Sequence, residues 1–261
     1  MKIELSLDKT VESNASEYYE KIKKLKKKLE GAKDALVDSK DKLKQLNKDK
    51  DKIIKELKEK KEQNELKEKK EWYEKFRWFL SSEDFLVLGG RDATSNEILI
   101  KKHTEKDDLI FHTDMIGSPF FVIKSEGKKP GKTTIQEAAD ATLTFSRAFK
   151  LGLATTPTFM ARPDQLSKKA PTGEYVPKGG FITEGNLKYI DNKINLAVGI
   201  YKNKIIAGPL EAIKNHCKDY LEIERGTDKP GKIAKTIKQK IGGELDDIIR
   251  VLPAGTFKIK K

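Results

Sequence analysis

The chain of 261 residues has a single cysteine, Cys217, and only three histidines. One cysteine excludes an intramolecular disulfide framework and is typical of a protein kept in a reducing cytosol. The histidines do not have the spacing that metal ligands need, so no metal site is predicted. No apolar run approaches the roughly 20 residues that span a bilayer, and the first residues do not resemble a signal peptide. We therefore expect a cytoplasmic protein that does not act in a membrane.

Positive charge is what the chain has in excess. It carries 54 basic and 41 acidic residues, a formal net charge of +13. The first 71 residues contribute +5, from 22 lysines and 17 acidic residues, and the remaining 190 contribute +8. Because both parts are basic, the expected partner is a polyanion, and nucleic acid is favoured over a membrane surface.

The first 71 residues predict a helical arm. Residues 1–8 alternate between apolar and polar side chains, which predicts a short strand or an extended leader. From Ile22 to Leu57, apolar residues then recur at alternating spacings of three and four, the heptad signature. A seam this thin is not buried by one helix, so the helix must pair. The polar run 47–52 predicts a turn, and hence a coiled-coil hairpin; a single long helix that dimerises is the alternative.

A lysine-rich segment stands out within the arm, between residues 21 and 28. Such a run is commonly a solvated helix face. The alternative is a stripe that follows a phosphate backbone, because lysines on adjacent turns of a rigid helix release counterions together. The stripe predicted here consists of Lys21, Lys24, Lys27 and Lys28.

Residues 72–190 predict an α+β body. Short apolar runs alternate there with one long helical pattern, which does not suit a doubly wound sheet. Trp72, Phe76 and Phe79 share one face of an expected helix that would anchor the arm. The other elements expected are strands at 85–88, 108–112, 119–124 and about 155–161, and a helix from a capping box at Thr134 and Glu137 to about Gly152.

From about Asp191 the pattern starts again, which predicts a second, small α/β unit over residues 191–261. The expected order is β-β-α-β-α-β. Its elements are a hairpin of 194–201 and 205–207, a helix from Pro209 to about Cys217, a strand at 220–223, a basic helix at 230–241 and a closing strand at 248–252.

Candidate phosphate-binding side chains lie in turns of the body. Arg91 follows the strand that ends at Gly89-Gly90, where it would face a partner; alternatively it only pairs with Asp92, which would cap a helix starting at Ala93. Basic loops at 127–132 and 167–169 would offer ammonium groups and free backbone N–H groups to phosphates, or would be merely solvated. The candidates are Arg91, Lys128, Lys129, Lys132, Lys168 and Lys169.

Little in the sequence supports catalysis. His112 and Asp114 are two residues apart on an expected strand, so their side chains share a face. They would form an acid–base pair of an RNA-modifying enzyme or, as we favour, a hydrogen-bonded structural pair. Gly89-Gly90 lacks the spacing of a dinucleotide or phosphate loop. We expect no enzyme activity, no cofactor and no small-molecule substrate.

Four blocks in order give the chain a resemblance to a known family. They are residues 72–79, 89–97, 112–117 and 167–175. Together they resemble the NFACT-R module of the NEMF/RqcH family of ribosome-associated quality-control factors, some bacterial members of which are called fibronectin-binding proteins. Asn14 with Tyr18 and Tyr19 is similar to the start of that family's coiled-coil arm, and residues 246–253 look like the extension of archaeal members.

The resemblance implies a role on stalled ribosomes. Members bind the large ribosomal subunit and recruit tRNA for template-free elongation of the nascent chain, through acidic and arginine residues that precede the arm. Those residues have no counterpart here, so the resemblance implies the C-terminal half alone. The implied partners are rRNA and stalk-base proteins of the large subunit, and tRNA. A protein-interaction module, whose coiled coil docks a protein while its basic charge is incidental, is the alternative.

Overall fold

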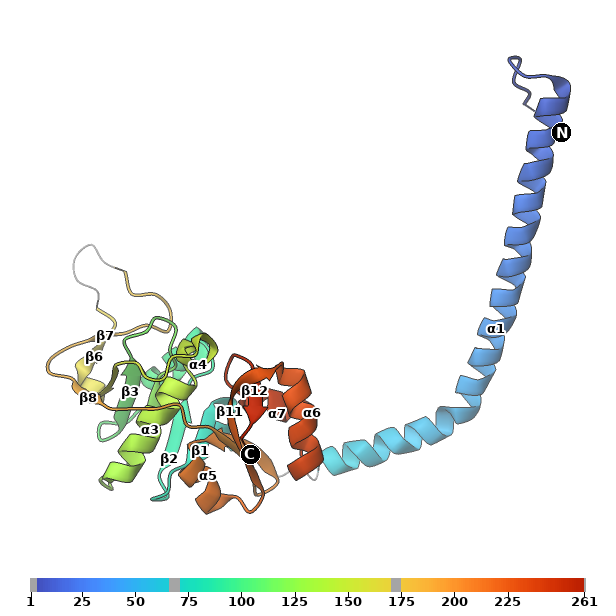
Figure 1. Ribbon diagram of the computed structural model, residues 1–261. Helices are drawn as coiled ribbons and strands as arrows, with labels where there is room; N and C mark the ends of the chain where they lie inside the picture. Colours follow the sequence, from blue (N-terminus) through green and yellow to red (C-terminus); the bar gives the residue numbers. More distant parts are fainter. Residues whose placement is uncertain (1–3, 66–70, 170–174, 261) are drawn as a thin grey trace. The chain divides into compact units, whose positions relative to one another are not determined.

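The computed structural model describes residues 4–65, 71–169 and 175–260, with the backbone alone over 46–65 (Figure 1). The chain divides into two compact units, Met1–Lys70 and Glu71–Lys261. In the described part of the chain, no helix is both long and apolar enough to cross a membrane.

The first unit is one helix and not a hairpin. Helix α1 runs without interruption over Val11–Glu65, which is 55 residues. The turn predicted at 47–52 is wrong, because that segment contains neither glycine nor proline and its lysines favour helix. The predicted seam lies on the surface of this single chain, with Leu25 and Leu43 each 63% exposed. Pairing of that seam stays a prediction.

Of the two alternatives predicted for the leader, the strand does not form over the described residues 4–8, which fold back onto the start of α1. The Asn14 side chain accepts a hydrogen bond from the Ser6 backbone N–H at 2.9 Å and donates to the Ser6 carbonyl at 3.0 Å. The Tyr18 hydroxyl donates to the Glu4 carbonyl at 2.7 Å. These side chains satisfy backbone groups that a lone strand would leave without a ladder partner.

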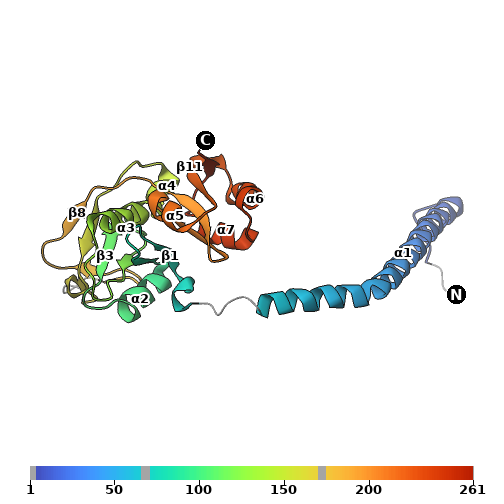
Figure 2. The same cartoon turned by 90° about the horizontal axis from the view of Figure 1, so that it is seen from below.

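The second unit begins with a six-stranded antiparallel sheet in the order β1-β2-β4-β3-β5-β8. Helix α3 lies across it against β3, β4 and β5 (Figures 1 and 2). The strands are β1 Arg77–Leu80, β2 Leu86–Gly89, β3 Leu109–Thr113, β4 Phe121–Ile123, β5 Thr158–Ala161 and β8 Lys188–Ile190, and the helices are α2 Ala93–Lys102, α3 Lys132–Thr144 and α4 Arg147–Leu151.

A four-stranded sheet in the order β10-β9-β11-β12 completes this unit. Helices α5 and α6 pack on its strands, and α7 packs on α6 and β10. The bounds are β9 Ala197–Tyr201, β10 Lys204–Gly208, β11 Tyr220–Asp228, β12 Phe257–Ile259, α5 Leu210–His216, α6 Pro230–Ile241 and α7 Leu245–Val251. A small pair, β6 Leu166–Ser167 with β7 Ile182–Thr183, and the 3-10 turns η1 Trp72–Lys75 and η2 Pro163–Gln165 lie outside both sheets.

The predicted strands of the body and the hairpin β9–β10 are confirmed, but three local predictions are wrong. The anchor helix is only η1, because β1 takes over at Arg77. The long helix begins with Gly131 as its N-cap and breaks before Arg147, where Ser146 caps α4. The closing strand predicted at 248–252 lies largely in helix α7, and β12 closes the sheet instead.

The two sheets share one hydrophobic core, so Asp191 is not a boundary between compact units. A Cβ atom added to Gly208 in β10 would lie 2.9 Å from the Phe79 ring of β1, which shows how closely the strands approach. The rings of Phe149 and Phe257 are 5.5 Å apart. The independence predicted for residues 191–261 therefore does not fit the packing: that segment completes the core of the body.

Candidate nucleic-acid interface

The turn after β2 is shaped by Gly90, Asp92 and Asn96. A Cβ atom on Gly90 would lie 1.8 Å from the Asn96 side-chain oxygen, so only glycine fits there. That oxygen accepts from the Phe120 backbone N–H at 3.2 Å. Asp92 caps α2 by accepting from the Ser95 backbone N–H at 2.8 Å, as the capping alternative predicted. The side chains of Asp92 and Asn96 thus stabilise the fold rather than face a ligand.

Arg91 is turned into the fold as well. Its guanidinium donates to the carbonyls of Lys75 at 3.2 Å, Phe76 at 2.8 Å and Arg250 at 2.7 Å. Burial, and then the charge of Arg250, lowers the pKa of Arg91 to about 10. Neither the predicted contact with a partner nor the alternative pairing with Asp92 matches this geometry. Arg91 instead links η1 and α7 to the turn before α2 through these hydrogen bonds.

Lys168 is held in a similar way. Its ammonium lies 3.5 Å from a carboxylate oxygen of Glu97, donates to the Pro177 carbonyl at 3.2 Å and sits 4.5 Å from the centre of the Phe181 ring. Glu97 also accepts from Lys101 and from the Gly179 backbone N–H, and these two hydrogen bonds lower the pKa of Glu97 to about 2. Lys168 therefore anchors its loop, whereas its neighbour Lys169 is exposed.

Lys128 and Lys129 are exposed in the turn between β4 and α3, and Lys132 is exposed as the first residue of α3. Glu83 holds this turn by accepting from the Gly131 backbone N–H at 3.0 Å and from Thr134. The predicted free backbone donors are thus partly engaged. Three lysine side chains on a fixed turn can contact phosphates without a large ordering cost.

The structure does not bring the two basic loops together. The turn with Lys128 follows the carboxyl end of β4. Lys168 packs on Phe181, whose ring lies 5.5 Å from that of Phe120, next to the amino end of β4. The loops therefore lie near opposite ends of that short strand.

The arm lysines Lys21, Lys24, Lys27 and Lys28 are exposed on α1. The spacing of Lys21, Lys24 and Lys28 places them on one helix face. Their contact with phosphate stays a prediction.

His112 and Asp114 do not form the predicted pair. The His112 Nε2 atom lies 3.2 Å from the Ser118 carbonyl, and its ring stacks on Phe120 at 4.1 Å. Asp114 lies beyond the end of β3, where its carboxylate accepts from the Tyr189 hydroxyl at 3.4 Å. His112 has a structural role, as favoured, but with other partners.

The environment of His112 predicts a loss of stability in acid. Burial lowers the pKa of His112, so the folded protein binds its proton at lower pH than the unfolded chain, which does so near 6.5. The free energy of unfolding should fall as pH decreases below about 6.5. Urea midpoints at neutral and mildly acidic pH measure this. His112→Gln should show a smaller difference; equal pH dependence in both proteins would contradict the assignment.

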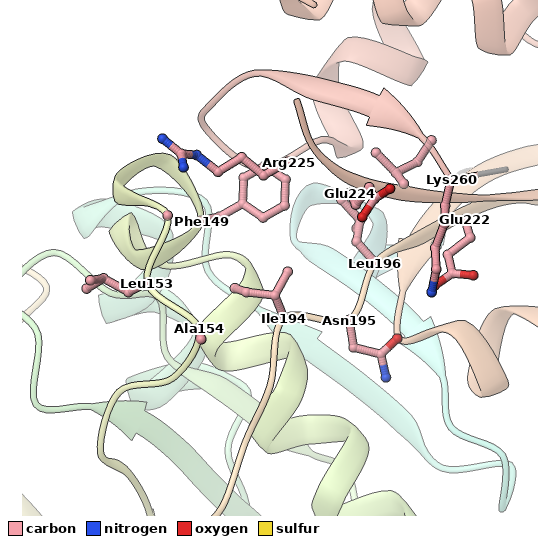
Figure 3. Close-up of a pocket in the computed structure, with 12 residues that line it drawn as sticks. Phe149, Leu153, Ala154, Ile194, Asn195, Leu196, Glu222, Glu224, Arg225 and Lys260 are labelled. Atoms are coloured by element: carbon pink, nitrogen blue, oxygen red, sulfur yellow. The ribbon is translucent and has the colours of Figure 1, made fainter. Parts of the chain in front are cut away.

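A pocket of about 290 Å³ lies between the end of α4, residues 194–196 and β11 (Figure 3). Its floor includes Phe149 and Leu196. Among its charged residues, Lys260 pairs with Glu222 at 2.6 Å. This pocket therefore combines apolar side chains with charged side chains, of which Glu222 and Lys260 compensate each other.

The sequence interpretation missed an aromatic cluster at η1. The Trp72 ring stacks on His103 with the centroids 4.7 Å apart and the planes at 15°. The Lys75 ammonium lies 3.0 Å from His103 Nε2. The sequence pattern places Trp72 on the anchoring face with Phe76 and Phe79, but the structure leaves it 46% exposed.

Comparison with known proteins identifies the body. Residues 75–185 match the family model described as NFACT protein RNA binding domain. The Archaeal Rqc2 homolog aRqcH of Methanocaldococcus jannaschii is 38% identical over 197 residues, 72% of this chain and 29% of that protein. The chain belongs to the NEMF/RqcH family. The human Ribosome quality control complex subunit NEMF is 33% identical over 183 residues, 68% of this chain and 16% of that protein.

This NEMF/RqcH family member thus spans less than a third of the archaeal relative's length. A solved C-terminal part of the fibronectin/fibrinogen-binding protein from Streptococcus suis is 25% identical, covers 48% of this chain and 47% of that one, and has a TM-score of 0.39. The matched RNA-binding domain contains both basic loops, while Trp72 lies three residues before it.

Proposed function

We propose that this chain is a non-catalytic, RNA-binding portion of a ribosome-associated quality-control factor. It binds the phosphate backbone of rRNA or tRNA through the body, and the arm extends to protein or RNA of the large ribosomal subunit. The observation that carries the proposal is the match of residues 75–185 to an RNA-binding domain. The exposed lysines of the 128–132 turn, inside that match, support it.

The geometry reduces the set of basic side chains that we propose contact phosphate. Arg91 and Lys168 use their donors within the protein. The exposed candidates in the body are Lys128, Lys129, Lys132 and Lys169. The six contacts expected from sequence therefore become four.

Salt dependence tests this revision. Each phosphate contact contributes about 0.7 to 0.9 to the slope of log affinity against log salt, so four contacts should give a slope of about −3 to −4 for the body. Fluorescence anisotropy with a labelled RNA duplex at several salt concentrations measures it. Lys128→Ala should reduce the slope by about one unit, with Lys193→Ala as a control outside both loops. A slope near zero would contradict backbone binding.

A protein partner for the arm is the second candidate. The apolar seam of α1 is exposed, with Ile22 at 47% and Leu29 at 58%. A heptad seam is the surface that another helix packs against. Affinity that depends on this seam should change little with salt, so the same salt series distinguishes arm docking from phosphate binding.

A further inference from the structure

Trp72 is the exposed tryptophan of the body. Its side chain keeps 46% of its surface exposed, whereas Trp78, the other tryptophan, keeps 8%. Next to it, Tyr73 turns inward and packs edge-on against Trp78 at 5.1 Å. The fold thus half-buries the second aromatic of η1 and leaves the first on the surface. An exposed indole offers a large planar apolar surface with one polar N–H group.

The indole rests on a fixed support. One face stacks on the His103 ring, and Tyr73 meets its edge with the centroids 5.7 Å apart. His103 is itself held from two sides, because its carbonyl accepts from the Lys124 ammonium at 3.0 Å and the Phe76 ring meets the imidazole edge-on at 5.5 Å. The exposed surface of Trp72 is therefore mainly its opposite face and free edge, presented as a rigid plane.

Cations surround this plane. Burial, and then the charges of Lys75, Lys124 and Lys102, lower the pKa of His103. The imidazole is thus neutral near pH 7, and its Nε2 accepts a hydrogen bond from the Lys75 ammonium. Lys124 is buried and pairs with Asp108 at 2.5 Å, so its charge is compensated. The side chains of Lys75 and Lys102 are exposed, and both lie close enough to His103, on which the indole stacks, to lower its pKa.

Two acidic side chains near this plane, Glu74 and Glu105, interact with other residues. The Glu74 carboxylate pairs with Lys204 at 2.6 Å and accepts from the Glu71 backbone N–H at 2.7 Å. Glu105 lies 3.2 Å from the Lys124 ammonium. The carboxylates of Glu74 and Glu105 are thus partly compensated, whereas Lys75 and Lys102 keep exposed ammonium groups.

We propose that Trp72 is a stacking platform for an unpaired nucleobase, with Lys75 and Lys102 contacting the phosphates on either side of that base. The inference rests on the proposed RNA-binding function and deepens it. An indole plane accepts any base, because every base has a π face, but it does not reach a base that is paired and stacked in a duplex. The selected RNA is therefore one with single-stranded or looped-out nucleotides, in any sequence.

Three RNA ligands test the proposal with the full chain. They are a single strand of about 12 nucleotides, the same strand with abasic sites, and a duplex of equal phosphate count. Trp72→Ala should weaken binding of the single strand by about 5- to 150-fold, since a stacked base contributes about 1 to 3 kcal/mol. Binding of the abasic strand and of the duplex should stay within about twofold. Tyr189→Ala, at an aromatic residue 55% exposed on β8, is the matched control and should change none of them.

Intrinsic fluorescence gives a second readout. The chain has two tryptophans, so Trp72→Phe leaves only the buried Trp78. The single strand should quench emission of the parent protein more than the abasic strand does, and should quench the Trp72→Phe protein little. Because phenylalanine keeps a ring, this variant should retain more affinity than Trp72→Ala.

The outcomes distinguish failure of the stacking platform from failure of RNA binding. If all three ligands bind and Trp72→Ala changes none, RNA binding stands and the stacking platform is wrong. Equal loss for all three would show that Trp72 supports the fold, which also overturns stacking. Selective capture of a helical peptide at Trp72, without RNA quenching, would assign the surface to protein. If no RNA binds the parent protein, the proposed function fails, and the platform with it.

Discussion

A chain that ends at Ile190 should not form a stable body. The deletion removes the strands and helices that cover Phe79 and Phe149, both of which are at most 1% exposed in the whole chain. It also removes the Val251 carbonyl that accepts from Arg77 at 3.3 Å. Exposing one large apolar side chain costs about 1.5 to 3 kcal/mol, against a total stability of about 5 to 15 kcal/mol. The shortened body should therefore lose its cooperative thermal transition and be digested completely by protease.

Removal of residues 1–70 is the matched control, because the second compact unit begins at Glu71. That deletion should leave the melting temperature of the body nearly unchanged. A protease-resistant fragment ending near residue 190, with a cooperative melt of its own, would show that residues 191–261 are independent. It would restore the boundary that the sequence pattern favours.

Arg91→Ala should destabilise the body by about 2 to 4 kcal/mol. It leaves three carbonyls without their donor, and hydrogen bonds to charged groups contribute about 1.5 to 3 kcal/mol each without adding in full. For a unit of this size, the melting temperature should fall by roughly 5 to 15 °C. Thermal unfolding followed by circular dichroism measures the change. Arg91→Lys should rescue it only in part, because one ammonium does not reproduce the planar fork.

Lys129→Ala provides the comparison for Arg91. This lysine is exposed in the turn before α3, so its loss should change stability by no more than about 0.5 kcal/mol while weakening binding to an RNA duplex. If Arg91→Ala instead kept the melting temperature and weakened duplex binding like Lys129→Ala, Arg91 would contact phosphate and the anchoring role would be wrong.

Local patterns predicted most of the body's elements. The strands at 85–88 and 108–112 are short apolar runs that end at turn residues, and the basic helix at 230–241 has proline in its first turn, as α6 has. These signals depend on residues that are close together in the chain, so they can be recognised in a single sequence. The run 248–252 is apolar without a clear period, and such runs do not distinguish a strand from a buried helix. Asp246 and Asp247, in the first turn of α7, were the available sign of a helix.

The roles of the candidate site residues depended on distant partners. Arg91 meets the carbonyl of Arg250, and Lys168 meets Glu97, pairs that are 159 and 71 residues apart. Pairs so far apart in the chain produce no local sequence pattern. The sequence therefore does not distinguish a turn residue whose side chain points into the fold from one whose side chain points into solvent. The heptad pattern of the arm likewise indicates that α1 has an apolar face that packs against another helix, but it does not identify that helix.

The shared core also has a consequence for synthesis. Long-range pairings form late because the intervening chain must first be ordered, and chains emerge from the ribosome with the N-terminal end first. Strand β1 packs against β10 and α5, and the Phe149 side chain packs against Phe257 of β12. The RNA-binding body of this chain therefore completes its fold only after residue 257 has emerged, whereas α1, whose contacts are local, forms while translation continues.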